Sequence, residues 1–216
     1  MPKNMVIRLL MFGFGAVLTT GMVLVGGNSA NAQRLPPAEQ MVAERVLGKA
    51  TAAVELIEYA SLSCPHCAAF HNGPWPTLKK EYVDTGKVKL IYRDFPTDKM
   101  ALAASMIARC APEERYFGII ELMFRTQDDW RRSKNPRGDL ANIGRLAGMS
   151  QATVEACLRN KILFEVVIKQ RNEGNQKLNV NSTPTFIVNG RKIDGVLSLE
   201  EFRLVFDQAL AKAAKK

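Results

Sequence analysis

The segment VELIEYASLSCPHC, residues 54–67, joins a run of β-forming residues to two closely spaced cysteines. Its first half, Val54–Ala60, is short and largely apolar, which predicts a strand with little exposed face. A three-residue turn follows, in which Ser63 can cap a helix. Pro65 suits the first helical turn, because the N–H that it lacks is not needed there. We therefore predict a strand, a turn and a helix that begins at Cys64.

The two cysteines form a candidate redox centre, because a Cys-X-X-Cys pair can close into a disulfide and reopen. Free backbone N–H groups and the positive end of the helix dipole point at Cys64, and His66 adds a donor or a partial positive charge. A thiolate stabilised in this way favours the reduced dithiol, so we expect the pair to give its disulfide away. Cys67, one turn into the helix, is the expected resolving thiol.

Haem attachment and zinc binding are other uses of a Cys-X-X-Cys pair. A c-type haem needs a histidine directly after the second cysteine, where this chain has Ala68. Zinc is harder to dismiss, because Cys64, Cys67 and His71 have plausible ligand spacing. A structural zinc site needs a fourth ligand, however, and the sequence has no second Cys-X-X-Cys or His pair. We predict no metal and no cofactor and place His71 on the helix surface, with zinc-bound or inert thiols as minor alternatives.

The first 32 residues have the layout of a secretory signal. Lys3 and Arg8 form a basic start, Leu9–Val25 is apolar, and Ala30-Asn31-Ala32 is a small-x-small cleavage site. We predict a signal peptide over residues 1–32 and export to the periplasm, an oxidising space in which disulfides persist. An uncleaved membrane anchor is the alternative. No later segment of the sequence is long and apolar enough to span a membrane.

The chain is basic. Its first 32 residues hold two of the 30 basic residues and none of the 21 acidic ones, so the remainder is still net positive. No basic run is interleaved with aromatic residues, and an exported protein rarely meets nucleic acid, so we predict no nucleic-acid partner. Arg131-Arg132-Ser133-Lys134 is predicted to be a solvated loop. The charge favours acidic unfolded chains or anionic lipid instead.

Hydrophobic periodicity and turn signals predict a βαβ unit followed by a wholly helical stretch. In the first unit, Gln40–Leu47 is a short helix or leader, and the Cys64 helix is interrupted near Gly73-Pro74-Trp75-Pro76 and continues to about Val83. A second strand covers Val88–Phe95. The helical stretch is predicted as five helices: Asp98 to about Cys110; one from Pro112 with Phe117, Ile120 and Phe124; one marked by Leu140, Ile143, Leu146 and Ala147; Ser150–Leu158; and Ile162 to about Leu178.

Strands return near the end of the chain. Thr185–Val188 and residues 191–193 flank Asn189-Gly190, a two-residue hairpin signal. Ser198-Leu199-Glu200-Glu201 is a capping box that opens a helix through about Ala211. The order βαβ, helical insert, ββα predicts an α/β protein with a thioredoxin fold and an inserted α-helical domain. The predicted divisions are residues 33–97 and 178–216 for the thioredoxin-fold domain and residues 98–177 for the insert.

The CPHC motif, its strand-turn-helix context, the helical insert and the Thr183-Pro184 step together resemble DsbA, a family of periplasmic thiol:disulfide oxidoreductases. The resemblance runs from about Gln40 to the C-terminus. It implies that Cys64 is the nucleophile that forms a mixed disulfide with substrate and that Cys67 resolves it. It also implies that Pro184 is a cis-proline facing the dithiol. Glu58, six residues before Cys64, matches the buried acid that assists proton transfer.

Elementary chemistry supports Glu58 and Pro184 independently. Strand alternation puts Leu56, Glu58 and Ala60 on one face, and burial there would favour a protonated acid able to pass a proton to Cys67. A cis X-Pro bond lays the adjoining backbone open for pairing with an extended peptide. The alternatives are that Glu58 is an edge residue and that Pro184 is an ordinary trans proline at a strand start.

Thr183 departs from the best-known DsbA pattern, in which valine commonly precedes the cis-proline. Threonine is familiar at this place among disulfide isomerases of the same fold, so an isomerase or reductase stays open beside the oxidase, and a non-catalytic chaperone stays as a third possibility. No dimerisation domain precedes the fold, and isomerases of this type usually carry one, so we expect the oxidase. We also expect a monomer. The resemblance further implies unfolded exported proteins as substrates and a membrane reoxidant of the quinone-coupled DsbB type.

Cys110 and Cys157 both fall in predicted helices of the insert, and neither has a Cys-X-X-Cys partner. In an oxidising compartment we expect them to form one structural disulfide between two helices. Two separate buried thiols are the alternative.

Overall fold

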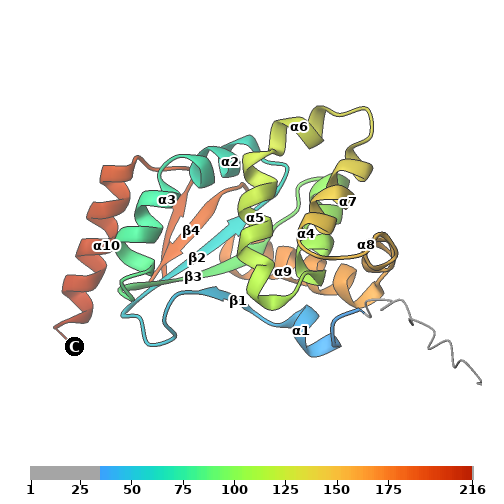
Figure 1. The fold of residues 1–216 in the computed structure, drawn as a ribbon. Helices are drawn as coiled ribbons and strands as arrows, with labels where there is room; N and C mark the ends of the chain where they lie inside the picture. Colours follow the sequence, from blue (N-terminus) through green and yellow to red (C-terminus); the bar gives the residue numbers. More distant parts are fainter. Residues whose placement is uncertain (1–34, 216) are drawn as a thin grey trace, which may run out of the picture. The chain divides into compact units, whose positions relative to one another are not determined.

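A five-stranded mixed sheet forms the centre of the computed structural model, which describes residues 35–215 (Figure 1). The strand order is β1-β3-β2-β4-β5. Strand β2 is parallel to β3 and antiparallel to β4, whereas β1 and β5 are antiparallel edge strands. The strands are β1 (Arg45–Leu47), β2 (Val54–Ala60), β3 (Val88–Asp94), β4 (Thr185–Val188) and β5 (Arg191–Asp194).

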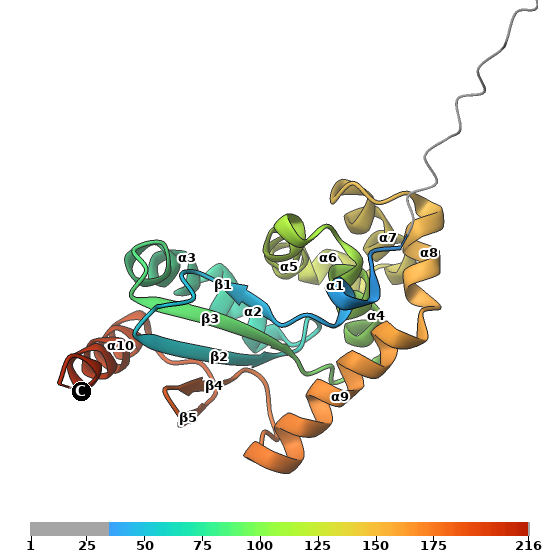
Figure 2. The ribbon, with the colours of Figure 1, turned by 90° about the horizontal axis from the view of Figure 1, so that it is seen from below.

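Helices cover the sheet and fill the connection between β3 and β4. Figures 1 and 2 show the helices of that connection gathered at one end of the sheet and α10 at the other. The helices are α1 (Ala38–Val42), α2 (Pro65–Asn72), α3 (Trp75–Leu78) with a π-helical turn (Lys79–Val83), α4 (Lys99–Cys110), a 3₁₀ turn (Glu113–Arg115), α5 (Tyr116–Arg125), α6 (Gln127–Arg132), α7 (Pro136–Leu146), α8 (Gln151–Leu158), α9 (Lys161–Leu178) and α10 (Leu199–Ala213).

One face of the sheet packs against α2, α3 and α10. The core there joins Leu56 of β2 and Phe186 of β4 to Phe70 of α2 and Phe202 of α10, all fully buried. The other face receives α9, where Gly174 lies so close to Tyr59 that a Cβ on the glycine would come within 2.6 Å of the ring. Alternation along β2 therefore sends successive side chains into two different layers.

The sequence predicted most of these elements correctly. Strand β2 has the predicted bounds, Asp98 caps α4 by accepting from Ala101 N, and Ser198 with Glu201 forms the capping box of α10. The Asn189-Gly190 turn has positive φ at both residues, as a two-residue hairpin requires. The predicted thioredoxin fold with a helical insert is thus the observed one.

Three local predictions were wrong. Gln40–Leu47 is not one helix or leader, because α1 ends at Val42 and Arg45–Leu47 pairs with β3 as an edge strand. Arg131 and Arg132 are solvent-exposed as predicted, but they belong to α6 and not to a loop, and the buried Trp130 holds that helix against the core. Leu146 ends α7 and is 74% exposed, so the apolar stripe of that helix stops before it.

A buried ion pair ties the sheet to the insert. Arg109 of α4 donates to the carboxylate of Asp94, the last residue of β3, at 2.5 Å, and both side chains are fully buried. Arg109 also donates to the main-chain oxygens of Met41 and Ala43 and to Gln170 of α9. With so many acceptors, the guanidinium is well compensated for its loss of water, and this cluster has the character of a structural anchor.

The predicted signal peptide, residues 1–32, lies outside the described residues. Within residues 35–215, none of the helices combines the length and apolar character that crossing a membrane requires.

Candidate active site

Cys64 occupies the N-cap position of α2, directly after the turn that leaves β2. Its backbone N–H bonds to Ser61 O at 3.0 Å, and no side chain caps the helix. Ser63, which the sequence suggested as the cap, instead donates from its hydroxyl to Asp98 at 2.5 Å. The free N–H groups of the first helical turn are therefore left for the Cys64 sulfur.

The two thiols have opposite environments. Cys64 is partly exposed, beside the exposed Pro65 and His66, whereas Cys67 is fully buried. Both are free thiols. A hydrogen bond with the Cys67 thiol is the largest cause that lowers the pKa of Cys64 to about 5, against the opposing effect of burial. Burial is the largest cause that raises the pKa of Cys67 well above its usual value.

Smaller contributions to the Cys64 thiolate come from three other groups. The side chain of Thr183 and the backbone N–H groups of Cys67 and His66 each lower the pKa of Cys64 through a hydrogen bond. His66 therefore acts through its main chain, and its imidazole is exposed. The predicted donor of His66 is thus its backbone N–H at the helix N-terminus.

The Thr183–Pro184 peptide bond is cis, as the sequence predicted. It lies against the dithiol, because the Cys64 sulfur is 3.3 Å from the carbonyl oxygen of Thr183. Pro184 is buried at the start of β4, and its carbonyl accepts a hydrogen bond from Gly195 N at 2.9 Å. The two segments of the site, 119 residues apart in the chain, thus meet at the Cys64 sulfur.

Gln127 of α6 is a site residue that sequence reasoning missed. Its side-chain amide donates to Leu62 O at 2.7 Å and to Cys64 O at 3.0 Å, and the side chain is buried. The insert thereby holds the turn that carries the nucleophilic cysteine. A single glutamine 63 residues from Cys64 gives no local signal for this role.

Glu58 lies beneath the dithiol on β2 and is fully buried, so the prediction of a buried acid is confirmed and the edge position is excluded. In the sheet it lies between Tyr92 of β3 and Phe186 of β4. Its negative charge is one of the causes that raise the pKa of Cys67.

His71 is buried, not on the helix surface as predicted. Its Nε2 lies 3.0 and 3.1 Å from the two carboxylate oxygens of Glu58, and its ring stacks on Phe124 of α5 at 4.1 Å between centroids. The prediction failed because α5 of the insert covers the side of α2 that would otherwise face water. Among residues 35–215, no group of three or more His, Cys, Asp or Glu side chains is placed to hold a metal ion.

Cys110 and Cys157 form the disulfide that the sequence predicted, between α4 and α8. Both residues are buried in the insert core. The loop that the bond closes spans 47 residues of sequence separation, so the bond restricts the unfolded chain strongly.

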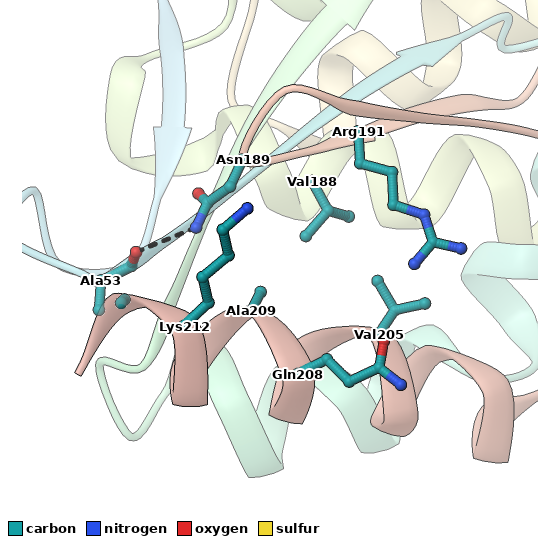
Figure 3. Close-up of a pocket in the computed structure, with 9 residues that line it drawn as sticks. Ala53, Val188, Asn189, Arg191, Val205, Gln208, Ala209 and Lys212 are labelled. Carbon is teal, nitrogen blue, oxygen red and sulfur yellow. Dashed lines mark hydrogen bonds between the residues drawn. The ribbon is translucent and has the colours of Figure 1, made fainter. Parts of the chain in front are cut away.

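A cavity of about 530 Å³ lies between α10 and the β4–β5 hairpin, lined by residues such as Val188, Arg191 and Lys212 (Figure 3). It also borders Ala53, just before the start of β2, whereas Cys64 follows the far end of that strand. The cavity is therefore at the opposite end of the sheet from the thiols, and the chemistry lies in the surface-exposed sulfur, not in a deep pocket.

Comparison with known proteins places the chain in a family. Residues 40–208 match the family model described as Thioredoxin. The chain belongs to the thioredoxin family, as a DsbA-like member. Among solved structures, Wolbachia pipientis alpha-DsbA1 has 30% identity and a TM-score of 0.75 over 79% of this chain and 92% of its own. BdbD from Bacillus subtilis, at 23% identity and a TM-score of 0.70 over 82% of this chain and 96% of its own, shares the fold.

Curated relatives agree with this placement. A protein of Rickettsia conorii named "Putative protein-disulfide oxidoreductase" is 33% identical over 80% of this chain. The chain spans 62% of the length of that relative. Disulfide bond formation protein D of Bacillus subtilis is 25% identical over 76% of each chain.

Proposed function

We propose that this protein is a thiol:disulfide oxidoreductase that donates the disulfide formed by Cys64 and Cys67 to exported proteins as they fold. The asymmetry of the two thiols is the observation that carries the proposal. The partly exposed Cys64 has a pKa of about 5, and the buried Cys67 has a pKa far above it. A dithiol whose exposed sulfur is stable as a thiolate favours its reduced form, and therefore oxidises other thiols.

The exchange proceeds in two steps that balance in atoms and electrons. A substrate thiolate attacks the Cys64 sulfur of the oxidised protein, a mixed disulfide forms, and Cys67 leaves and takes up a proton. A second substrate thiolate then attacks the substrate sulfur of the mixed disulfide, which releases Cys64 as a thiolate and leaves a disulfide in the substrate. The reduced product matches the present arrangement, in which the two free thiols are hydrogen-bonded to each other.

Substrate binding is proposed at the backbone that faces Cys64. Thr183 is only partly buried and Pro65 and His66 are exposed, so an extended peptide can reach the sulfur past these three residues. Main-chain pairing beside Thr183 and Pro184 accepts many sequences, which suits unfolded polypeptides as substrates.

An isomerase or reductase is the second candidate, and Thr183 is the observation behind it. Its side chain hydrogen-bonds Cys64 and helps to lower the pKa of that thiol. Because this contact stabilises the thiolate, it supports a more oxidising dithiol rather than a more reducing one. The geometry therefore favours the oxidase, and a direct assay separates the two.

The decisive assay compares oxidation of a reduced, unfolded two-cysteine protein with repair of a scrambled-disulfide protein. We expect fast oxidation and weak repair by residues 33–216. A Cys67→Ser variant should accumulate the mixed disulfide with substrate on Cys64, visible by mass spectrometry. Repair faster than oxidation, or a redox potential as reducing as about −270 mV, would overturn the oxidase in favour of the second candidate.

Export and partners form the remaining part of the proposal. The composition of residues 1–32 supports a cleaved signal peptide and a periplasmic location, with retention of a membrane anchor as the alternative. The DsbA-like family supports a membrane reoxidant of the DsbB type, and we propose that the protein acts as a monomer. Cell fractionation with sequencing of the mature N-terminus tests the first point. Light scattering of the purified protein tests the last.

A further inference from the structure

The Glu58–His71 pair is a buried ionisable group that the exchange scheme above leaves unused. His71 lies four residues after Cys67 on α2, so the two side chains point from the same face of the helix. Glu58 on β2 faces that helix from the sheet, and the imidazole Nε2 is within hydrogen-bond distance of both carboxylate oxygens. The side chains of His71 and Glu58 are 3% and 0% exposed.

The contacts fix how the proton of the pair is held. Because an ionised carboxylate can only accept, we assign a hydrogen to Nε2 in the reduced protein, shared by the two oxygens that lie 3.0 and 3.1 Å away. Among the described residues, the other ring nitrogen, Nδ1, has no hydrogen-bond partner. An imidazole with its hydrogen on Nε2 and a bare Nδ1 leaves no buried N–H donor unsatisfied.

The groups around the His71 ring come from β2, α2, α3, α5 and β3. Strand β2 contributes Glu58, α2 contributes Cys67, and α5 contributes the uncharged Phe124, on which the ring stacks. Strand β3 contributes Tyr92, with its ring centroid 6.3 Å away, and burial raises the pKa of Tyr92 well above its usual value. Trp75 of α3 is uncharged. Among residues 35–215, Glu58 and Cys67 are thus the groups placed to exchange a proton with His71.

We propose that His71 is a positioning residue that acts through Glu58, holding the carboxylate beneath Cys67 and sharing with it the proton that Cys67 takes up when the disulfide opens. This inference rests on the proposed function. In the oxidised protein the Glu58–His71 pair carries one proton more than in the reduced protein, the state in which Cys64 and Cys67 are free thiols. When a substrate thiolate bonds to Cys64 and the Cys64–Cys67 bond breaks, that proton moves to the Cys67 sulfur.

The step balances without a further reactant. One disulfide bond forms and one breaks, Cys67 becomes a neutral thiol, and the pair is left as a carboxylate that accepts from Nε2. The contact between Nε2 and both carboxylate oxygens, which this final state requires, is present in the structure together with the two free thiols. The pair regains its proton from solvent when the dithiol is reoxidised. Without this proton, the leaving Cys67 thiolate would face the negative charge of Glu58 in a buried site.

A double-mutant cycle tests the proposal. The variants are His71→Gln, which keeps an N–H donor for Glu58 but cannot share a titrating proton, Glu58→Gln, and the two combined. The readout is the rate at which reduced glutathione opens the Cys64–Cys67 disulfide between pH 5 and 8.5. We expect each single variant to slow opening about tenfold at neutral pH and to alter the pH profile, and the double variant to be no slower than Glu58→Gln alone.

Two controls separate this role from a structural one. Gln170→Leu removes buried hydrogen bonds to Arg109 and Asp94, none of which involves Glu58, His71 or Cys67, so it should lower stability without changing the pH profile. His71→Phe keeps a ring on Phe124 but removes the donor, and should be as slow as His71→Gln. Two results would overturn the proposal. One is a double variant whose opening rate is lowered by the product of the two single-variant factors. The other is a His71→Gln variant whose opening rate has the same pH profile as that of the parent.

Nuclear magnetic resonance supplies a readout that needs no variant. The chain has only two histidines, so the imidazole ¹⁵N signals of His66 and His71 are readily told apart by their exposure. We expect the Nε2–H tautomer for His71 in the reduced protein and a changed signal in the oxidised one. Identical His71 signals in both states would contradict the proposal. Because glutathione replaces the protein substrate, failure here is distinguishable from failure of the proposed oxidase.

Discussion

The four cysteines of this chain form two pairs whose environments differ in almost every respect. Cys64 and Cys67 are neighbours on one helix, both thiols are free, and one of them is partly exposed. Cys110 and Cys157 come from different helices, are buried, and are bonded to each other. A disulfide exchanges only when a thiolate can reach one of its sulfurs, so burial makes the second pair inert.

The difference shows where reactivity comes from. Cys64 faces the N–H groups of its own helix, the Cys67 thiol and Thr183, all of which stabilise negative charge on sulfur. Cys110 is the last residue of α4, and Cys157 lies within α8, so neither sulfur is at the start of a helix. The position of a cysteine in its helix, together with its exposure, thus separates an exchanging pair from a structural one.

Removing Cys64 should have the largest effect. We expect Cys64→Ser to lower the rate of substrate oxidation by at least about three orders of magnitude, because the serine hydroxyl cannot form the mixed disulfide. The paired change Cys110→Ser with Cys157→Ser should leave the rate per folded molecule as it was. Oxidation of a two-cysteine peptide measures both. Comparable loss of activity in the two proteins would erase the distinction between the pairs.

Removing the second pair should instead change stability. We expect the Cys110→Ser, Cys157→Ser protein to lose up to about 4 kcal/mol in its free energy of unfolding, because the bond closes a long loop in the unfolded chain. Urea unfolding of both proteins without reductant, with the Cys64–Cys67 pair oxidised in each, measures the loss. A change below about 1 kcal/mol, the usual size of a surface effect, would show that this bond does little for the fold.

The pH dependence of stability should distinguish the reduced from the oxidised protein. The pKa of Cys64 falls from 9.0 to about 5 on folding, so between these values the unfolded reduced chain binds a proton that the folded one does not. The stabilisation is complete above pH 9 and is lost as pH falls towards 5. Cys67, with its raised pKa, stays protonated in both states up to about pH 8.

Urea unfolding at pH 5 and pH 8 measures this linkage. The reduced protein should gain stability relative to the oxidised protein as pH rises, because Cys64 cannot titrate in the disulfide and the other groups largely cancel in the difference. If the free energy of unfolding changed by the same amount in the reduced and the oxidised protein between pH 5 and pH 8, folding would leave the pKa of the Cys64 thiol unperturbed.

Thr183→Val should have the smallest effect. Loss of the hydroxyl removes one hydrogen bond from the thiolate, and a net bond is worth about 1 kcal/mol, so the pKa of Cys64 should rise by up to about one unit. The equilibrium with glutathione should then shift towards the disulfide by up to about tenfold. Thr183→Ser, which keeps the hydroxyl, is the matched control and should behave like the parent. Equal shifts in both variants would assign the effect to packing.

Local signals explain why the sequence predicted so much of the fold and of the reactive pair. Strand β2, the Cys64 turn and the hairpin at Asn189-Gly190 are each specified by residues a few positions apart. The thiolate of Cys64 follows largely from the same local geometry, because the Cys67 thiol, the largest cause, and the backbone N–H groups that also stabilise it belong to its own helix.

Contacts between distant segments explain what the sequence did not predict. His71 looks like a surface residue on α2 alone, and only α5, which brings Phe124 onto the ring, makes it a buried partner of Glu58. Gln127 acts on Cys64 from the insert, and β1 exists because β3 offers it an edge. None of these contacts is marked in the sequence by hydrophobic periodicity or by a turn or capping motif.

Titration of the Cys64 thiol tests the distinction between the two cysteine pairs most directly. The absorbance of a thiolate near 240 nm, followed from pH 3 to 9 in the reduced protein and in its Cys64→Ser variant, isolates this one group. We predict a transition near pH 5 that the variant lacks and that oxidation removes. A single transition near pH 9, as for an unperturbed cysteine, would contradict a stabilised thiolate and with it the direction of exchange proposed for Cys64 and Cys67.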